Sequence, residues 1–307
     1  MIDFGGIEGG GTKFVCGIGT GPDDLELASF STTSPQATVE KVAEFFRAHS
    51  QGPLAAVGIG SFGPVDIHPD SPTFGYVTST PKQDWRHFDS AGAIGKELGV
   101  PVGFDTDVNA AARGEAQWGA GRGVRNFVYL TVGTGIGGGA ITHGNLIHGL
   151  VHPEMGHIRI PHNFTKDPYP GGCPYHQDCL EGLASGPAMQ ARWGVPPCDL
   201  PKDHPGWALE AHYLGLGLAT WVCTLSPQKF ILGGGIMQQA HLFPMVQQEL
   251  ARSLNNYIQA AELLEKIDQY VVPPQLGNRS GVLGALVLAE RAYQNTLSTS
   301  STLGANK

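Results

Sequence analysis

Three glycine clusters in this chain have the composition of phosphate-binding turns. Each follows a stretch that we expect to be a strand, and two of them carry a threonine hydroxyl. Without Cβ atoms, backbone N–H groups in such turns can point together at an anion and let it come close. The clusters are Glu8-Gly9-Gly10-Gly11-Thr12-Lys13, Val132-Gly133-Thr134-Gly135-Ile136-Gly137-Gly138-Gly139 and Leu232-Gly233-Gly234-Gly235-Ile236. One such cluster alone is more often a hairpin turn or a helix start, but three together favour phosphate binding. Neither the Rossmann fingerprint nor the Walker P-loop is present.

Two carboxylates stand where a predicted strand ends and a predicted helix begins. They are Asp105 and Asp107, in the run Phe104-Asp105-Thr106-Asp107-Val108-Asn109. Ligands of α/β sheets bind beyond the carboxyl ends of the strands. A carboxylate there can accept the proton of a hydroxyl that attacks phosphorus. An Asp at this position is equally typical of a helix N-cap, so the pattern leaves open which of the two caps the helix and which is the base.

A cysteine- and histidine-rich segment has the spacing of a zinc site. Cys173, His176 and Cys179 place three metal-binding side chains within seven residues. The candidates for a fourth ligand are His157, with His152 and His162 in reserve. Four protein ligands complete a tetrahedral site and leave no open position, which favours a structural metal over a catalytic one. The alternative is two buried thiols beside a surface histidine.

Alternating strands and helices are predicted to position these residues. The predicted strands are 2–8, 13–19, 25–31, 54–60, 100–104, 127–132, 136–142 and 229–232. The predicted helices are one that begins at Pro35 and those at 89–98, 107–118, 183–193, 206–225, 244–257 and 281–293. Residues 61–85 form a loop too long for a simple connector, and residues 144–182 are irregular. The likeness between GIEGGGTK and TVGTGIGGG is compatible with two related halves.

Length and charge narrow the class of protein. A chain of 307 residues suggests two domains, each with its own core. The net charge of −8 gives a nucleic-acid surface no electrostatic support. No segment approaches the roughly 20 apolar residues that a spanning helix needs, and the first residues, MIDFGGIEGG, do not resemble a signal peptide. We therefore expect a cytoplasmic protein with neither a nucleic-acid nor a membrane partner.

Taken together, these motifs resemble the ROK family (repressor, open reading frame, kinase), and within it the fructokinase branch. The resemblance covers about residues 2–290. GIEGGGTK is similar to the first phosphate motif, DTDVNAAARGE to the segment with the catalytic Asp, LTVGTGIGGG to the second phosphate motif and ILGGGI to the adenosine-side motif. PEMGH followed by GCPYHQDCLEG resembles the sugar-binding and zinc signature.

The resemblance implies an α/β fold of the actin-like kind (ASKHA, ribonuclease H-like), a two-domain sugar kinase fold with the active site in the cleft between the domains. We expect a small domain over 1–115 and a large domain over 116–294 that carries a zinc-binding insert at 157–181. The C-terminal helix 281–294 is expected to pack back on the small domain. The Ser/Thr-rich tail, 295–307, is expected to be disordered.

The resemblance also implies a role for each motif residue. Asp107 matches the general base. The sugar-binding residues are Gly63, Thr106, Asn109, Glu154 and His157. The residues that bind ATP and its phosphates are Glu8, Gly10, Gly11, Thr12, Lys13, Thr134, Gly135, Gly234 and Gly235. The zinc ligands are His157, Cys173, His176 and Cys179. ATP, Mg²⁺ and a structural Zn²⁺ are the implied cofactors, and a homodimer is the implied assembly.

Three positions depart from the commonest family pattern. Glu8 replaces an Asp, Thr106 replaces the sugar-binding Asn of the glucokinase branch, and His176 replaces a Cys. The segments GSFGPVD (60–66) and TSTPKQDW (78–85) resemble the fructokinase branch. No helix-turn-helix of the kind found in the family's repressors is expected before the first strand.

The predicted reaction is therefore the ATP-dependent phosphorylation of D-fructose at its 6-hydroxyl. The alternatives are a kinase for mannose, glucose or an amino sugar, and a non-catalytic sugar-binding regulator. The base is intact at Asp107, which argues against the regulator because sugar binding alone does not need a base.

Overall fold

The chain forms two compact units in the computed structural model, which describes residues 2–80 and 82–304. Unit 1 comprises Met1–Arg122, His148–His152 and Asn278–Lys307, and unit 2 comprises Gly123–Ile147 and Pro153–Gly277. The first boundary was expected at residue 115 and lies at Arg122. It lies there because helix α3 (Asp107–Trp118) packs along α10 (Ser280–Gly304) in unit 1, and the chain leaves this unit only after α3 has ended.

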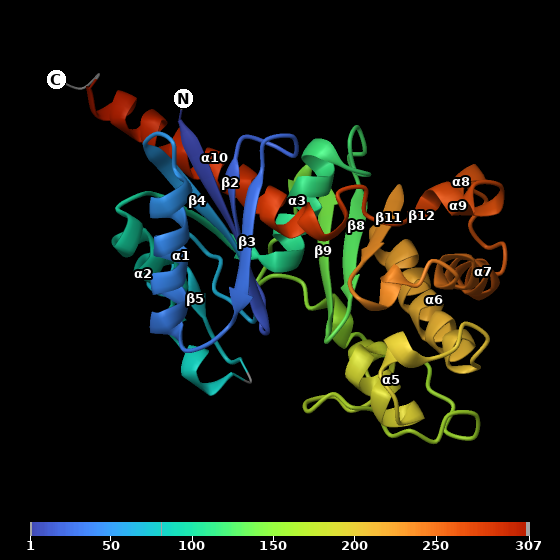
Figure 1. Cartoon of the computed structure of the whole chain (residues 1–307). Coiled ribbons are helices and arrows are strands. Elements are labelled where there is room, and N and C mark those ends of the chain that lie inside the picture. Colours follow the sequence, from blue (N-terminus) through green and yellow to red (C-terminus); the bar gives the residue numbers. More distant parts are fainter. Residues whose placement is uncertain (1, 81, 305–307) are drawn as a thin grey trace. The chain divides into compact units, whose positions relative to one another are not determined.

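A five-stranded sheet in the order β3-β2-β1-β4-β7 is the centre of unit 1 (Figure 1). Its strands are β1 (Asp3–Gly9), β2 (Lys13–Gly19), β3 (Glu26–Ser31), β4 (Leu54–Ser61) and β7 (Val102–Thr106). Strands β1, β4 and β7 are parallel, whereas β2 and β3 run antiparallel to their neighbours. The five strands predicted for this half of the chain are confirmed. A small hairpin of β5 (Tyr76–Val77) and β6 (Phe88–Asp89) was not predicted.

Helices cover both faces of this sheet. Consecutive side chains of a strand point to opposite faces, and two glycines of β1 show which helix lies on each. A β-carbon at Gly5 would lie 2.6 Å from the ring of Phe46 in α1 (Pro35–His49). One at Gly6 would collide with the carbonyl oxygen of Val282 in α10. Helices α1 and α2 (Ser90–Leu98) pack together on the first face, and α3 and α10 pack together on the second.

Helix α10 lies directly on the strands because glycines face it. A β-carbon at Gly58 of β4 or at Gly103 of β7 would collide with the backbone of α10. The helix continues through Gly304, so the prediction of a disordered tail is wrong for residues 295–304. Extending an existing helix costs less free energy than nucleating a new one. The packed first part of α10 is the existing helix that these residues extend. Residues 305–307 lie outside the described part of the chain.

Unit 2 repeats the strand arrangement of unit 1. Its sheet has the order β10-β9-β8-β11-β12. The strands are β8 (Phe127–Val132), β9 (Ile136–Thr142), β10 (Asn145–Leu146), β11 (Lys229–Gly233) and β12 (Val271–Val272). As in unit 1, the first three strands of the unit form an antiparallel meander, and the last two run parallel to the first. The two sheets have the same strand order and the same strand directions, which agrees with the two related halves that the glycine motifs suggested.

The helices of unit 2 pack around a core that includes Trp207, Tyr213 and Leu218 of α6. These helices are α4 (Leu180–Ala184), α5 (Gly186–Trp193), α6 (Gly206–Leu225), α7 (Leu242–Leu254), α8 (Ala261–Leu264) and α9 (Ile267–Tyr270). Helix α7 was predicted to reach residue 257, but it stops at Leu254 because Asn255 adopts the left-handed conformation with φ 45°. Within the described residues, no helix is long and apolar enough to cross a membrane.

Candidate active site and metal cluster

Three strands of unit 1 end side by side at one edge of its sheet. Gly9 of β1 is paired with Ser61 of β4, and Ser61 is paired with Thr106 of β7. Because the three strands are parallel, the segments that follow them leave from the same edge. The sheet therefore brings together the first phosphate loop, the loop that contains Gly63, and the start of α3, where Asp107 lies.

Asp107 is the first residue of α3, and its carboxyl group is not the cap of that helix. The cap is Thr106, whose Oγ1 accepts a hydrogen bond from the N–H of Asn109 at 3.1 Å. The alternative in which one of the two aspartates caps the helix is therefore wrong. Burial raises the pKa of Asp107 to about 6, which brings a carboxyl group into the range that suits a general base near neutral pH.

Glu8, near the end of β1, is electrostatically coupled to Asp107. Its pKa is raised to about 7, first by burial and second by the charge of Asp107, while Lys13 and the N–H of Val282 act in the opposite direction. Two carboxylates that raise a pKa by mutual repulsion form a region where a cation is stabilised. Glu8, which was predicted to bind phosphate, and Asp107, the predicted base, thus lie in one electrostatic neighbourhood.

The first glycine loop turns between β1 and β2. The N–H of Gly10 donates to the carbonyl oxygen of Lys13 at 2.9 Å, which closes the turn. The N–H groups of Gly11 and Thr12 donate to no other described residue, so both donors are available to an anion.

Lys82 approaches this loop, a placement that sequence reasoning missed. Its Cε lies 3.5 Å from where a β-carbon on Gly11 would be. The side chain is half-buried, and its ammonium forms no ion pair with a described residue. The segment TSTPKQDW was used only to choose a family branch, although a lysine there is also a candidate ligand for phosphate.

The predicted sugar-binding residues of unit 1 differ in exposure. Gly63 is half-buried, whereas Thr106 is buried and occupied as the helix cap. Asn109 is fully buried, and its Nδ2 donates to Oδ1 of Asp105 at 2.6 Å. Nε2 of His148 lies 2.9 Å from the other oxygen of Asp105. His148 was not predicted as a site residue.

The two glycine loops of unit 2 also lie next to each other. Strands β8 and β11 are parallel neighbours, so the loops after Val132 and Gly233 leave from one edge. Gly234 has φ 91°, and a β-carbon there would collide with the backbone of Val132. Only glycine fits this position. Thr134 and Gly235 are exposed.

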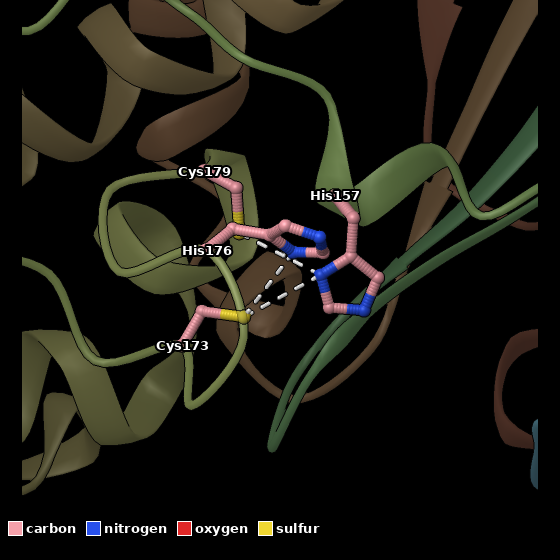
Figure 2. A group of neighbouring side chains, drawn as sticks. All are labelled: His157, Cys173, His176 and Cys179. Carbon is pink, nitrogen blue, oxygen red and sulfur yellow. Dashed lines mark hydrogen bonds between the residues drawn. The ribbon is translucent and has the colours of Figure 1, made fainter. Parts of the chain in front are cut away.

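Four side chains of unit 2 converge in a cluster (Figure 2), and they are the four that the sequence predicted, His157, Cys173, His176 and Cys179. Nδ1 of His157 lies 3.6 Å from each sulfur, and Nδ1 of His176 lies 3.7 Å from that of Cys173. Bonds of about 2.0–2.3 Å to a tetrahedral zinc imply ligand separations of about 3.4–3.8 Å. The donor set and these three separations fit zinc, and all four ligand atoms lie within 4.8 Å of one another.

The two reserve ligands lie elsewhere. Nε2 of His152 accepts a hydrogen bond from the N–H of Val65 in unit 1. His162 lies between two aspartates, with its nitrogens 3.7 Å from Asp167 and 3.5 Å from Asp178. Of the three candidates for the fourth position, only His157 joins the cluster.

Glu181 joins the cluster to the second glycine loop, a relationship that the sequence did not reveal. One of its oxygens lies 3.9 Å from Nε2 of His157. The other accepts a hydrogen bond from the N–H of Ile136 at 2.9 Å. Glu154 is exposed and caps the single turn that ends at His157, whose N–H donates to the carbonyl oxygen of Glu154 at 3.0 Å. Displacing His157 would therefore disturb both glutamates.

Known proteins place this chain in one family. The model of the ROK family matches residues 4–292. The chain belongs to the ROK family. A Bacillus subtilis relative is 49% identical over 292 residues, with 95% of this chain and 96% of the relative covered. The fructokinase of Pediococcus pentosaceus is 41% identical over 293 residues, which covers 95% of this chain and 99% of that enzyme.

Solved structures of ROK proteins have the same fold. A ROK family glucokinase from Streptomyces griseus, crystallised with glucose and AMPPNP, is 27% identical with a TM-score of 0.74 and covers 94% of this chain and 99% of its own. The ROK hexokinase of Thermus thermophilus is 25% identical with a TM-score of 0.76, and the match covers 95% of this chain and 99% of that enzyme. The expected actin-like (ASKHA) α/β fold is confirmed.

Proposed function

We propose that this ROK protein is an ATP-dependent fructokinase that phosphorylates D-fructose at the 6-hydroxyl, with Asp107 as the general base. The observation that carries the proposal is Asp107 itself: a carboxyl group at the carboxyl end of β7, with a pKa of about 6, that does not cap its helix. The name and the 41% identity of the Pediococcus enzyme support fructose as the substrate.

The glycine loops bind the phosphates of ATP in this proposal. Unit 1 contributes the open N–H groups of Gly11 and Thr12, with positive charge from Lys13 and Lys82. Unit 2 contributes Thr134 and Gly135 after β8 and Gly234 and Gly235 after β11. The remaining phosphate residues, Glu8 and Gly10, support the first loop. These groups stabilise the charge that spreads over the transferring phosphoryl group.

Asp107 accepts the proton of the attacking hydroxyl as the bond to phosphorus forms. The sugar is oriented by Gly63 and the neighbourhood of Thr106 and Asn109 in unit 1, and by Glu154 and His157 in unit 2. Orientation matters because a kinase gains most of its rate from positioning and charge stabilisation.

Two metals complete the proposal. Zinc, held by His157, Cys173, His176 and Cys179, fixes the turn that presents Glu154. In this proposal Glu8 holds magnesium through water. Burial and the charge of Asp107 raise its pKa to about 7, and a divalent cation would relieve the repulsion between the two carboxylates. Magnesium neutralises phosphate charge when bound. The homodimer that the resemblance implies stays part of the proposal, and light scattering measures it.

Turnover of a hexose panel tests the function. We expect fructose to have the highest kcat/KM with ATP, and NMR of the product to place the phosphate on the 6-oxygen. A preference for glucose by about tenfold or more, about 1.4 kcal/mol in transition-state binding, would favour the activity that the Streptomyces relative's name describes. Binding of hexoses without any turnover would favour the non-catalytic regulator.

A further inference from the structure

The segment His148–His152 belongs to unit 1, although the chain before and after it belongs to unit 2. Three imidazoles attach it there. Nε2 of His152 accepts from the N–H of Val65 at 3.2 Å, and Nε2 of His68 lies 2.7 Å from the carbonyl oxygen of Leu150. The third is His148, whose Nε2 lies 2.9 Å from Oδ2 of Asp105.

This segment touches both parts of unit 1 to which sugar binding was assigned. A β-carbon at Gly63 would lie 3.5 Å from Cε1 of His152. At its other end, Nε2 of His148 lies 3.4 Å from Nδ2 of Asn109 as well as against Asp105. Asp105 is two residues before the proposed base. Glu154, proposed to bind the sugar, follows two residues after the segment ends.

The chemistry of Asp105 determines how its two partners are oriented. A carboxylate accepts hydrogen bonds and donates none. The side-chain nitrogen of Asn109 and Nε2 of His148 must therefore both be donors toward it. Neutral His148 then carries its proton on Nε2, which leaves Nδ1 as an acceptor. Nδ1 of His148 has no hydrogen-bond partner among the described residues.

Exposure decides which member of this trio can meet a ligand. Asn109 is 0% exposed and Asp105 is 3% exposed, whereas the side chain of His148 is 40% exposed. Asn109 also keeps a buried Oδ1 without a hydrogen-bond partner. The two buried groups can orient an imidazole, but in this arrangement only the imidazole can reach a sugar.

We propose that His148 is a sugar-binding residue, in which Nδ1 accepts a hydrogen bond from a hydroxyl of the hexose while Asp105, itself held by Asn109, fixes the ring. The inference rests on the proposed function and refines it. The contact assigned to Asn109 passes to His148, and Asn109 becomes a positioning residue. A hydroxyl is the matching ligand group because a neutral imidazole in this tautomer offers an acceptor and no second donor.

The test compares His148→Ala with His148→Gln and His68→Ala. His148→Ala should raise the KM for fructose about tenfold, the effect of one lost hydrogen bond, and leave the KM for ATP unchanged. His148→Gln keeps an N–H for Asp105 and should remain folded even if the alanine variant does not. It should still raise the KM for fructose, because the imidazole Nδ1 is gone.

His68→Ala is the matched control. It removes an imidazole that contacts the same segment but not Asp105, so the KM of this variant for fructose should stay unchanged.

Chemical modification gives a second readout that does not depend on turnover. In the wild-type enzyme, fructose should slow the reaction of diethyl pyrocarbonate with His148, measured by mass spectrometry, and leave the reaction of His68 unchanged. A wild-type enzyme that phosphorylates fructose without protecting His148 overturns this inference alone. So does an equal rise in the fructose KM in the His68 and His148 variants. If the wild-type enzyme neither binds nor phosphorylates any hexose, the proposed function fails and the inference fails with it.

Discussion

Burial first and the charge of Asp107 second raise the pKa of Glu8, although Glu8 and Asp107 lie almost a hundred positions apart in the chain. The register of β1, β4 and β7 explains the proximity, because it aligns Gly9 with Ser61 and Ser61 with Thr106. A change in the charge of Asp107 therefore alters the pKa of Glu8.

Replacing the proposed base tests its role directly. Asp107→Asn should lower kcat by about 10²–10⁴-fold, the usual contribution of a general base, because the amide cannot accept the hydroxyl proton. Binding of fructose, measured by calorimetry, should change little. A variant that keeps more than about half of the activity would show that Asp107 has a structural role only.

The rate should depend on pH through the same group. A base works only when it is deprotonated, and burial raises the pKa of Asp107 to about 6. As the pH falls through about 6, the active form is lost and kcat/KM for fructose should decrease toward tenfold per pH unit. The profile is measured with ATP and Mg²⁺ saturating at each pH. A rate that stays level down to about pH 4.5 would contradict the assignment, since an exposed aspartate titrates near 3.9.

Glu8→Gln should make the protein more stable and less active. The folded pKa of Glu8, raised by burial and by the charge of Asp107 to about 7, lies above its ordinary value of 4.5. The stabilisation from protonated Glu8 is complete below the unfolded pKa and is lost as the pH rises through about 7. Glutamine stays neutral, so the melting temperature of the variant should exceed that of the wild type at about pH 8 and match it more closely at about pH 4.5.

The loss of activity in Glu8→Gln should be repaired in part by more magnesium. Glutamine retains an oxygen but not the charge that attracts the ion. The measurements are thermal melts without nucleotide and a magnesium titration of the initial rate. Lower stability of the variant at pH 8 would show that the charge of Glu8 stabilises the fold.

Lys82 is expected to act on the phosphate. Its Cε lies over Gly11, and its ammonium has no ion-pair partner among the described residues. Lys82→Ala should lower kcat/KM for ATP by about tenfold or more, the range expected for a charge-assisted hydrogen bond. Lys96→Ala, an exposed lysine on α2, is the control and should behave as the wild type. Equal effects in the two variants would indicate a general change of surface charge.

Local patterns predicted the regular elements that carry the site, because alternation and helical spacing are properties of short segments. The strands around Glu8 and before Asp107 were predicted in this way, as was the metal cluster, where Cys173, His176 and Cys179 are close in the chain. The positions of Lys82 and His148 could not be predicted. Both lie in long irregular segments whose path depends on contacts with distant residues, Gly11 for the first and Asp105 for the second.

The same limit applies to Asn109 and to the end of the chain. A motif shows that Asn109 is present but not that it is buried beneath an imidazole supplied from residue 148. Composition alone suggested disorder after Asn295. Composition does not show that α10 packs closely against three strands at their glycines.

The metal cluster permits the most direct test. We expect one zinc per chain, because four ligand atoms converge within 4.8 Å of one another and the two sulfur atoms each lie 3.6 Å from Nδ1 of His157. Cys179 is fully buried, so Cys179→Ala removes a ligand that water cannot readily replace. The variant should lose zinc and melt at a lower temperature, since structural zinc contributes directly to folding free energy. Fructose binding should weaken as well, because His157 supports the turn of Glu154 and contacts Glu181, whereas ATP binding should suffer less.

Cys198→Ala and Cys223→Ala are the controls, because both thiols are exposed and outside the cluster. Elemental analysis of protein purified without chelator measures the metal. A closed structural site holds nearly one metal ion per chain. If the protein contains less than about 0.2 zinc per chain and is fully active, these cysteines and histidines are ordinary structural side chains.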